Sequence, residues 1–77
     1  MKVKVYAPGF CNFTHIDEDG FVEMKEGSTV GDLFKKIEVP FVYRPLPIYK
    51  VNYKKAGLNT VLNEGDVVSF LSIIAGG

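Results

Sequence analysis

Residues 29–37 read Thr-Val-Gly-Asp-Leu-Phe-Lys-Lys-Ile, and this stretch predicts the one helix around which the chain folds. Thr29 can cap the helix, and Asp32 three residues on completes a capping-box arrangement at the positive end of the helix dipole. Pro40 ends the helix by residue 39. Gly31 costs up to about 1 kcal/mol relative to alanine unless close packing requires it. Apolar residues recur at i, i+3, i+4 and i+7 and form one continuous face: Val30, Leu33, Phe34 and Ile37.

Short strands are predicted on both sides of this helix. Residues 2–7 alternate polar and apolar side chains, which is typical of a half-buried strand. Asn52-Tyr53 has the position of a tight turn between two later strands. The remaining strands are predicted at residues 21–25, 48–51, 67–74 and, as a short strand, within 54–61.

This order of elements predicts an α+β fold in which one main helix covers one face of a mixed sheet of four to five strands. The first and last strands are the most apolar, so they should lie parallel at the centre of the sheet. That arrangement is the β-grasp, or ubiquitin-like, fold. All 77 residues then form a single domain that ends in a flexible Gly-Gly tail, over about residues 74–77. The predicted core consists of Val3, Val5, Val30, Leu33, Phe34, Ile37, Val68 and Phe70.

Composition excludes several classes of protein. Nine basic and nine acidic residues cancel, so the broad positive field of a nucleic-acid-binding protein is missing. Hydrophobic residues make up 47% and charged residues 23% of the chain, as in an ordinary globular domain. Neither a signal peptide nor a membrane span is indicated. A single cysteine fits a reducing compartment. We therefore expect a cytoplasmic protein that is a monomer when free, without a membrane or nucleic-acid partner.

Catalytic chemistry has little support in the sequence. His15 has no cysteine, serine or acid at a motif spacing, and one histidine with one cysteine cannot form a structural zinc site. Cys11 is favoured as a buried or half-buried thiol over a nucleophile. The acidic run 17–19 is favoured as a solvated turn over a cation site. No catalytic residue and no metal ligand is therefore predicted.

The last residues are the reactive feature of the chain. Gly76 and Gly77 follow directly on an apolar strand, and a carboxylate on such an unhindered segment can enter a narrow site and be activated there. From Ile74 to Gly77 the chain could extend roughly 13 Å. The alternative is an idle terminus at which glycine has no role.

Four segments occur in a defined order along the chain. They are residues 27–34 (Gly-Ser-Thr-Val-Gly-Asp-Leu-Phe), Val51-Asn52, residues 62–68 (Leu-Asn-Glu-Gly-Asp-Val-Val) and residues 70–77, which end in Ala-Gly-Gly. Together they resemble the ThiS and MoaD sulfur-carrier proteins. The Ile-Ala-Gly-Gly ending and the short length lean towards ThiS, because MoaD tails more often carry prolines before the Ala-Gly-Gly.

The resemblance implies that Gly77 is the site of reaction. A ubiquitin-activating-type adenylyltransferase would use ATP to adenylate its carboxylate. Sulfur from a cysteine desulfurase or another persulfide source would then displace AMP and leave a thiocarboxylate. Ile74, Ala75 and Gly76 would enter the partner's site with it. The chain would be a co-substrate that binds no cofactor of its own, and not an enzyme.

The resemblance leaves the pathway open. A ThiS-like carrier would supply a thiazole synthase in thiamine biosynthesis. A MoaD-like carrier would supply the large subunit of molybdopterin synthase, or its tungsten counterpart. A ubiquitin-like modifier joined to protein lysines and a plain interaction module are further alternatives. Leu71 and Ile73 are predicted to form a partner-binding surface on the sheet face away from the helix.

Two features depart from the resemblance. Tyr53 stands where the family usually has glycine after asparagine, so a type I′ turn there would be strained or replaced. The loop 41–47 is unusually rich in aromatic residues and proline. It indicates either a particular partner or a lid over the small core.

Overall fold

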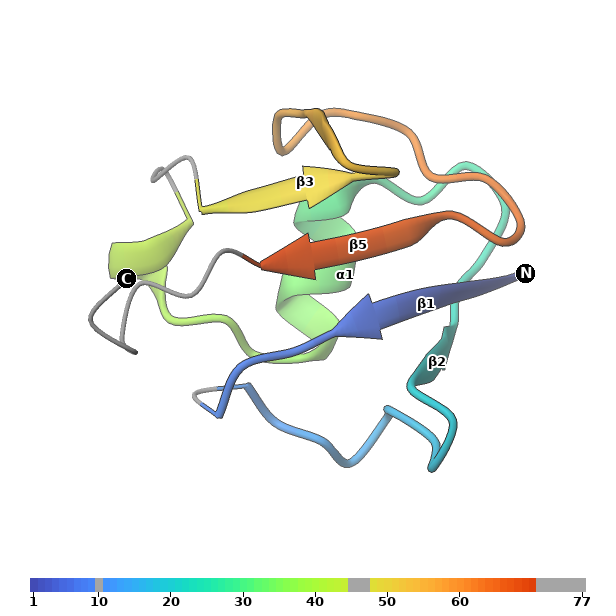
Figure 1. Ribbon diagram of the computed structural model, residues 1–77, viewed down its shortest axis with the longest axis horizontal. Helices are drawn as coiled ribbons and strands as arrows, with labels where there is room; N and C mark the ends of the chain where they lie inside the picture. The colour runs from blue at the N-terminus through green and yellow to red at the C-terminus, as the bar shows by residue number, and fades with distance from the viewer. Residues whose placement is uncertain (10, 45–47, 71–77) are drawn as a thin grey trace.

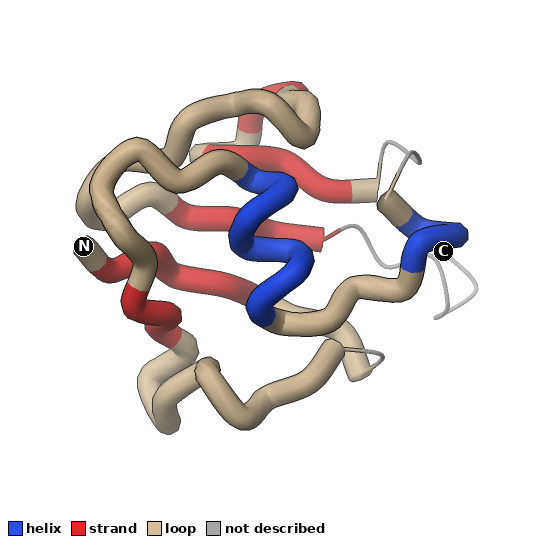
Figure 2. Tube along the Cα trace, turned by 180° about the vertical axis from the view of Figure 1, so that it is seen from behind, coloured by secondary structure: helices blue, strands red, loops and turns tan. Residues whose placement is uncertain are grey.

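The structure, a computed structural model, describes residues 1–9, 11–44 and 48–70. Within these residues, five short strands form one mixed sheet, and a single α-helix packs across one of its faces (Figures 1 and 2). No described helix is long and apolar enough to cross a membrane. In chain order the elements are β1 (Lys2–Tyr6), β2 (Phe21–Glu23), α1 (Val30–Lys36), the 3-10 helix η1 (Phe41–Tyr43), β3 (Tyr49–Val51), β4 (Lys54–Lys55) and β5 (Val67–Phe70).

The strand order in the sheet is β2-β1-β5-β3-β4. β1 and β5 are parallel, with Val5 opposite Val68, and every other pair of neighbouring strands is antiparallel. The prediction that the first and last strands lie parallel in the middle of the sheet is confirmed. One helix across such a mixed sheet is the β-grasp fold.

The helix begins with the predicted capping box. The Thr29 hydroxyl accepts a hydrogen bond from the Asp32 backbone N–H at 3.2 Å, and the Thr29 N–H donates to the Asp32 carboxylate at 2.9 Å. The latter bond is the main cause that lowers the pKa of Asp32. The helix ends at Lys36, because Glu38 adopts a left-handed φ of 56° and the N–H of Val39 turns back to the Phe34 carbonyl.

Residues 56–61 extend past the first turn of α1 instead of continuing the sheet. The N–H of Val30 donates to the Thr60 carbonyl at 2.9 Å, and that of Gly31 donates to the Leu58 carbonyl at 2.8 Å. These bonds satisfy N–H groups that have no partner within the helix, so the predicted fourth strand is confined to β4. A Cβ at Gly31 would lie 3.2 Å from the Leu58 carbonyl oxygen. Close packing is therefore the reason for glycine at this position.

The core lies between the sheet and α1. Every predicted core residue except Phe70 is buried. Phe70 is partly buried, and its ring lies 5.3 Å from that of Phe34, centroid to centroid. Several residues that were not predicted in the core are also buried, among them Val22, Val39 and Leu62.

β3 and β4 are joined by a two-residue turn at Asn52 and Tyr53. Both residues have positive φ, 52° and 64°, as a type I′ turn requires. The turn is therefore kept, although Tyr53 is not glycine. The Asn52 side chain stabilises the turn through two hydrogen bonds. Its amide donates to the Asp66 carboxylate at 3.0 Å, and its side-chain oxygen accepts from the Val67 N–H at 2.9 Å.

Replacing Tyr53 with glycine should stabilise the protein. A left-handed φ costs a residue with a Cβ roughly 1–2 kcal/mol, and glycine removes this strain. Glycine also gives the unfolded chain more conformational freedom, which offsets part of the stabilisation. We expect the free energy of unfolding in urea to rise by about 0.5–1 kcal/mol. Tyr53→Ala is the control, because alanine also has a Cβ and should bring no gain. A Tyr53→Gly protein less stable than the parent would contradict a strained turn.

Candidate functional site

The proposed reactive segment follows the last described strand. Gly77, Gly76, Ala75 and Ile74 lie outside the described residues, as do Leu71 and Ile73. The structure describes where this segment begins, which is the end of β5 at Phe70. β5 is the middle strand of the sheet, paired with β1 on one side and β3 on the other.

The end of β5 packs against the core. Val68 is fully buried, and the Phe70 ring lies against Phe34 of α1 and Tyr49 of β3, with centroids 5.3 Å and 6.4 Å apart. Phe34 and Tyr49 themselves meet edge to face at 4.8 Å. The residues after Phe70 therefore start from a fixed point on the domain, which is useful for presenting a reactive group to a partner.

The sheet face away from α1 is covered by no described helix, and it is the face viewed in Figure 1. Residues directly opposite each other on paired strands point to the same side of a sheet. Tyr6, Ser69 and Lys50 form one such row across β1, β5 and β3. Lys4 and Val67 form the next row. This surface, which we call the open face, thus runs along both sides of the strand that leads to the tail.

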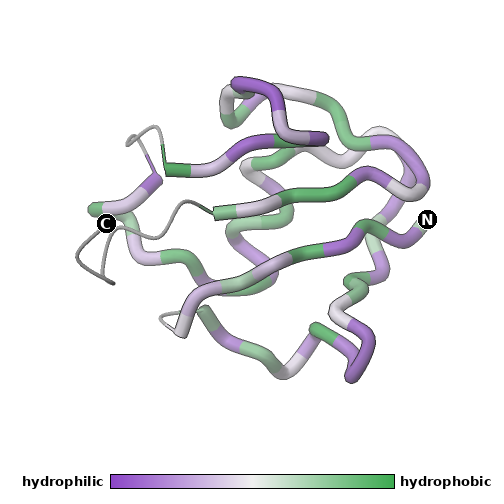
Figure 3. Tube along the Cα trace, viewed as in Figure 1, coloured by the Kyte–Doolittle hydropathy of each residue, from purple (hydrophilic) through white to green (hydrophobic). Residues whose placement is uncertain are grey.

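The open face is rich in lysine although the protein has no net charge. Lys2 and Lys4 lie on it from β1, and Lys50 and Lys55 face each other directly across β3 and β4. Like charges directly opposite each other destabilise a strand pair. In Figure 3 the β3–β4 hairpin is mostly hydrophilic. A partner that presents carboxylates here would relieve this repulsion.

Lys54 and Lys55 are both exposed. The sequence did not predict that Lys55 joins Lys50, Lys4 and Lys2 on one surface. Strand pairing creates that surface, because the two hairpins are distant in the sequence. For the part of this surface that β1 contributes, the sequence did give an indication, which is the period-two alternation of residues 2–6.

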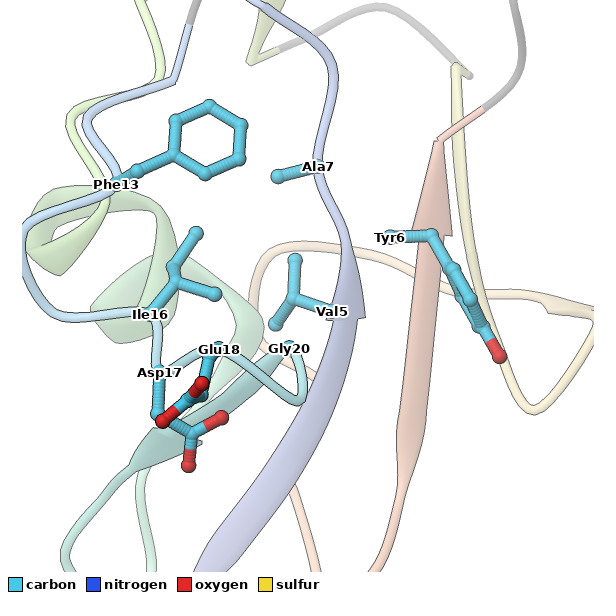
Figure 4. Close-up of a pocket in the computed structure, with 8 residues that line it drawn as sticks. All are labelled: Val5, Tyr6, Ala7, Phe13, Ile16, Asp17, Glu18 and Gly20. Atoms are coloured by element: carbon cyan, nitrogen blue, oxygen red, sulfur yellow. The ribbon is translucent and has the colours of Figure 1, made fainter.

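A hollow of about 630 Å³ lies between β1 and the following loop (Figure 4). Apolar side chains, including those of Val5, Phe13 and Ile16, line most of it, and Asp17 and Glu18 lie at one end. The Asp17 carboxylate accepts hydrogen bonds from the N–H groups of Asp19 and Phe21, both at 2.9 Å. These bonds, chiefly that from Phe21, lower the pKa of Asp17. Its carboxylate thus stabilises a turn, as the sequence analysis favoured for residues 17–19.

The described residues show no arrangement for chemical catalysis. His15 is exposed on the surface. Within the described ranges, no group of three or more His, Cys, Asp and Glu side chains is placed to hold a metal ion.

Cys11 is a buried thiol, as the sequence favoured. Its side chain is 8% exposed, and burial raises its pKa from the ordinary value of 9.0 to about 11. Because the thiolate is the reactive form, the side chain is unsuited to act as a nucleophile near neutral pH.

Alkylation of Cys11 by iodoacetamide at pH 8 should be slow in the folded protein. A pKa shifted from 9.0 to about 11 lowers the thiolate fraction roughly 100-fold, and burial slows the reaction further. Mass spectrometry should show at least that difference between native and urea-unfolded protein. Because the pKa of Cys11 is higher in the folded protein than in the unfolded chain, the unfolded chain loses the thiol proton first. The free energy of unfolding is therefore highest below pH 9, with respect to this group, and decreases as the pH rises towards 11. Equal rates in the two states would contradict a buried thiol.

The motifs shared with sulfur carriers have structural roles. The Asn52 amide and the Asp66 carboxylate, which come from two different motifs, are hydrogen-bonded to each other. Leu62 is buried, and its N–H donates to the Ser28 carbonyl at 2.8 Å. Together with the Thr29–Asp32 capping box, these contacts hold the fold. These three motifs explain how β5 is placed, and the fourth, residues 70–77, contains Gly77.

A β-grasp domain without a catalytic cluster among its described residues, whose central strand leads to a Gly-Gly tail, has the form of a ubiquitin-like carrier. The model of the ThiS family matches residues 12–77, which is most of the chain and includes the tail. This protein belongs to the ThiS family, whose members are small sulfur carriers and not enzymes. No curated protein and no solved structure matched the chain.

Proposed function

We propose that this protein carries sulfur as a thiocarboxylate on Gly77 and donates it for the thiazole of thiamine. The observation that most supports the proposal is that the ThiS family match extends through Gly77. The core anchoring of β5 adds a physical argument, since it gives the tail a fixed origin. We also propose that the protein acts in the cytoplasm, where thiol reductants are present.

The reaction requires activation because a carboxylate is a poor electrophile. The Gly77 carboxylate attacks the α-phosphorus of ATP, and pyrophosphate leaves to give an acyl-adenylate. The terminal sulfur of a persulfide then attacks the carbonyl carbon and displaces AMP. Two-electron reduction of the resulting acyl disulfide by a thiol leaves the thiocarboxylate. ATP is bound by the activating enzyme, and a cysteine desulfurase or another persulfide source supplies the sulfur.

The partners in this proposal are a ubiquitin-activating-type adenylyltransferase and a thiazole synthase. We assign their contact surface to Leu71 and Ile73 together with the open face around Tyr6 and Ser69. Ile74, Ala75 and Gly76 enter the partner's active site ahead of Gly77. The Lys50–Lys55 pair favours partners that present carboxylates to the open face.

Intact-protein mass spectrometry tests the proposal. The protein is incubated with the adenylyltransferase, ATP, a cysteine desulfurase, cysteine and a thiol reductant. It should gain the mass of one exchange of oxygen for sulfur, and fragmentation should place this exchange at Gly77. Formation of the thiazole phosphate product by thiazole synthase from the loaded protein should follow. An unmodified carboxylate would contradict sulfur carriage.

The same loaded protein separates the alternatives. Molybdopterin formation with the large subunit of molybdopterin synthase, without thiazole formation, would place the carrier in that pathway. A conjugate in which Gly77 is joined to a lysine of another protein would identify a modifier.

A further inference from the structure

The short helix η1 exposes two large apolar side chains. Phe41 is 79% exposed and Val42 is 71% exposed, whereas Tyr43 of the same turn packs against the core. The sequence left two interpretations of the loop 41–47, a lid over the core or a contact with a partner. Tyr43 fits the first interpretation, whereas Phe41 and Val42 do not cover the core. We call Phe41 and Val42 the knob. Residues 45–47 lie outside the described residues.

Contacts within the chain hold the Phe41 side chain and the backbone of the knob. The Arg44 guanidinium lies over the Phe41 ring, with its carbon 4.2 Å from the ring centroid, and the Arg44 Nε donates to the Val39 carbonyl at 2.9 Å. The turn is closed by the N–H of Tyr43 donating to the Pro40 carbonyl and that of Arg44 to the Phe41 carbonyl. A side chain already fixed in this way loses little entropy on binding, so it is suited to anchor an interface.

The surroundings of the knob indicate the chemistry of what it contacts. An open hollow of about 470 Å³ lies beside Phe41, with the positive side chains of Lys35 and Arg44 in its lining. Glu38 also lines it, but the Glu38 carboxylate accepts a hydrogen bond from the Asn12 side chain at 2.6 Å. A complementary surface would be apolar at its centre and would carry carboxylates at its edge.

The knob lies at the end of the molecule from which the tail starts. Figures 1 and 2 both show η1 beyond the ends of β1 and β5, and β5 ends at Phe70. Seven residues, 71–77, follow Phe70 and can span at most about 25 Å. A partner that holds the Gly77 carboxylate therefore has its reactive centre within that distance of this end.

We propose that Phe41 and Val42 insert into an apolar pocket of the enzyme that activates Gly77, and that carboxylates at the pocket's rim face Lys35 and Arg44. The inference rests on the proposed function, and it adds a second contact besides the open face. Contact with the knob determines which activating enzyme binds this carrier. The tail, in contrast, supplies the reacting group.

Steady-state kinetics of pyrophosphate release by the activating enzyme tests the knob. The double variant Phe41→Ser/Val42→Ser should raise the KM for the carrier at least about tenfold, the effect of losing an anchor residue. The kcat at saturation should stay unchanged, because Gly77 and ATP are unaltered. Lys35→Glu should also raise the KM and weaken its dependence on salt concentration.

Tyr53→Asn is the matched control. Tyr53 is 68% exposed and lies in the β3–β4 turn at the opposite end of the sheet, and asparagine tolerates its left-handed φ. Its KM should stay within about twofold of the parent value, because it lies away from the knob and from the end of β5 where the tail starts. Urea unfolding of each variant confirms that the fold is kept.

The possible failures are distinguishable. If the parent protein were activated normally and the double variant had the same KM, the proposed insertion of the knob into the activating enzyme would be contradicted. The proposed function would be unaffected. A parent protein that releases no pyrophosphate with any activating enzyme would overturn the proposed function and the knob with it. Sedimentation of the parent as a dimer, and of the double variant as a monomer with unchanged KM, would assign the knob to a second copy of this chain and overturn the proposed partner.

Discussion

Removing Gly77 should abolish sulfur loading while the fold stays intact. The truncated chain still ends in a carboxylate, on Gly76, but this group is retracted by about 3.3 Å, the length of one extended residue. In-line attack on the α-phosphorus of ATP depends on position as much as on chemistry. Intact-protein mass spectrometry should therefore detect no exchange of oxygen for sulfur in the shortened protein.

One added alanine after Gly77 should have the same consequence, because it moves the carboxylate the other way and adds a Cβ. The matched control is Gly57→Ala, since a Cβ at that position meets no atom within 4 Å. This variant should be loaded like the parent. Loading of the truncated chain at the parent rate would show that Gly77 is not the site of reaction, and the idle-terminus alternative would be favoured.

Leu33→Ala should lower the free energy of unfolding by about 2–5 kcal/mol, because it leaves a cavity in the core. Leu33 is fully buried on the helix face that packs against the sheet. A loss of this size is a large part of the stability of a small domain. Chemical denaturation measures it, and a strong reduction of the midpoint is expected.

The control for this prediction is Lys35→Ala on the exposed side of the same helix. Surface substitutions of this kind change stability by about 0.5 kcal/mol or less. If Leu33→Ala and Lys35→Ala had the same denaturation midpoint as the parent, the packing of α1 through Leu33 would be contradicted.

The helix was predictable because its determinants are local. Thr29 and Asp32 are three residues apart and form the cap within a single turn. Leu33, Phe34 and Ile37 follow the helical period and are all buried. The alternation in β1 likewise placed Val3 and Val5 in the core without any knowledge of their partners.

The lengths of the later strands were less predictable because they depend on distant contacts. The fourth strand was predicted within residues 54–61, yet only Lys54 and Lys55 pair with β3. The next residues bond instead to the free N–H groups at the start of α1, through the carbonyls of Leu58 and Thr60. Residues 56–61 could pair with β3 or bond to the start of α1, and the periodicity of the sequence does not indicate which of the two occurs.

By itself, the sequence determined the single helix, the β-grasp order of elements, the buried Cys11 and the identification of Gly77 as the proposed reactive group. These depend on neighbouring residues, on period and on motif, so they can be read along the chain. Only the tertiary structure decided that Lys4, Lys50 and Lys55 share the open face, and that Phe41 and Val42 point outward while Tyr43 packs inward. Strand pairing and core packing join residues far apart in the chain, and a surface made in this way exists only after the chain has folded.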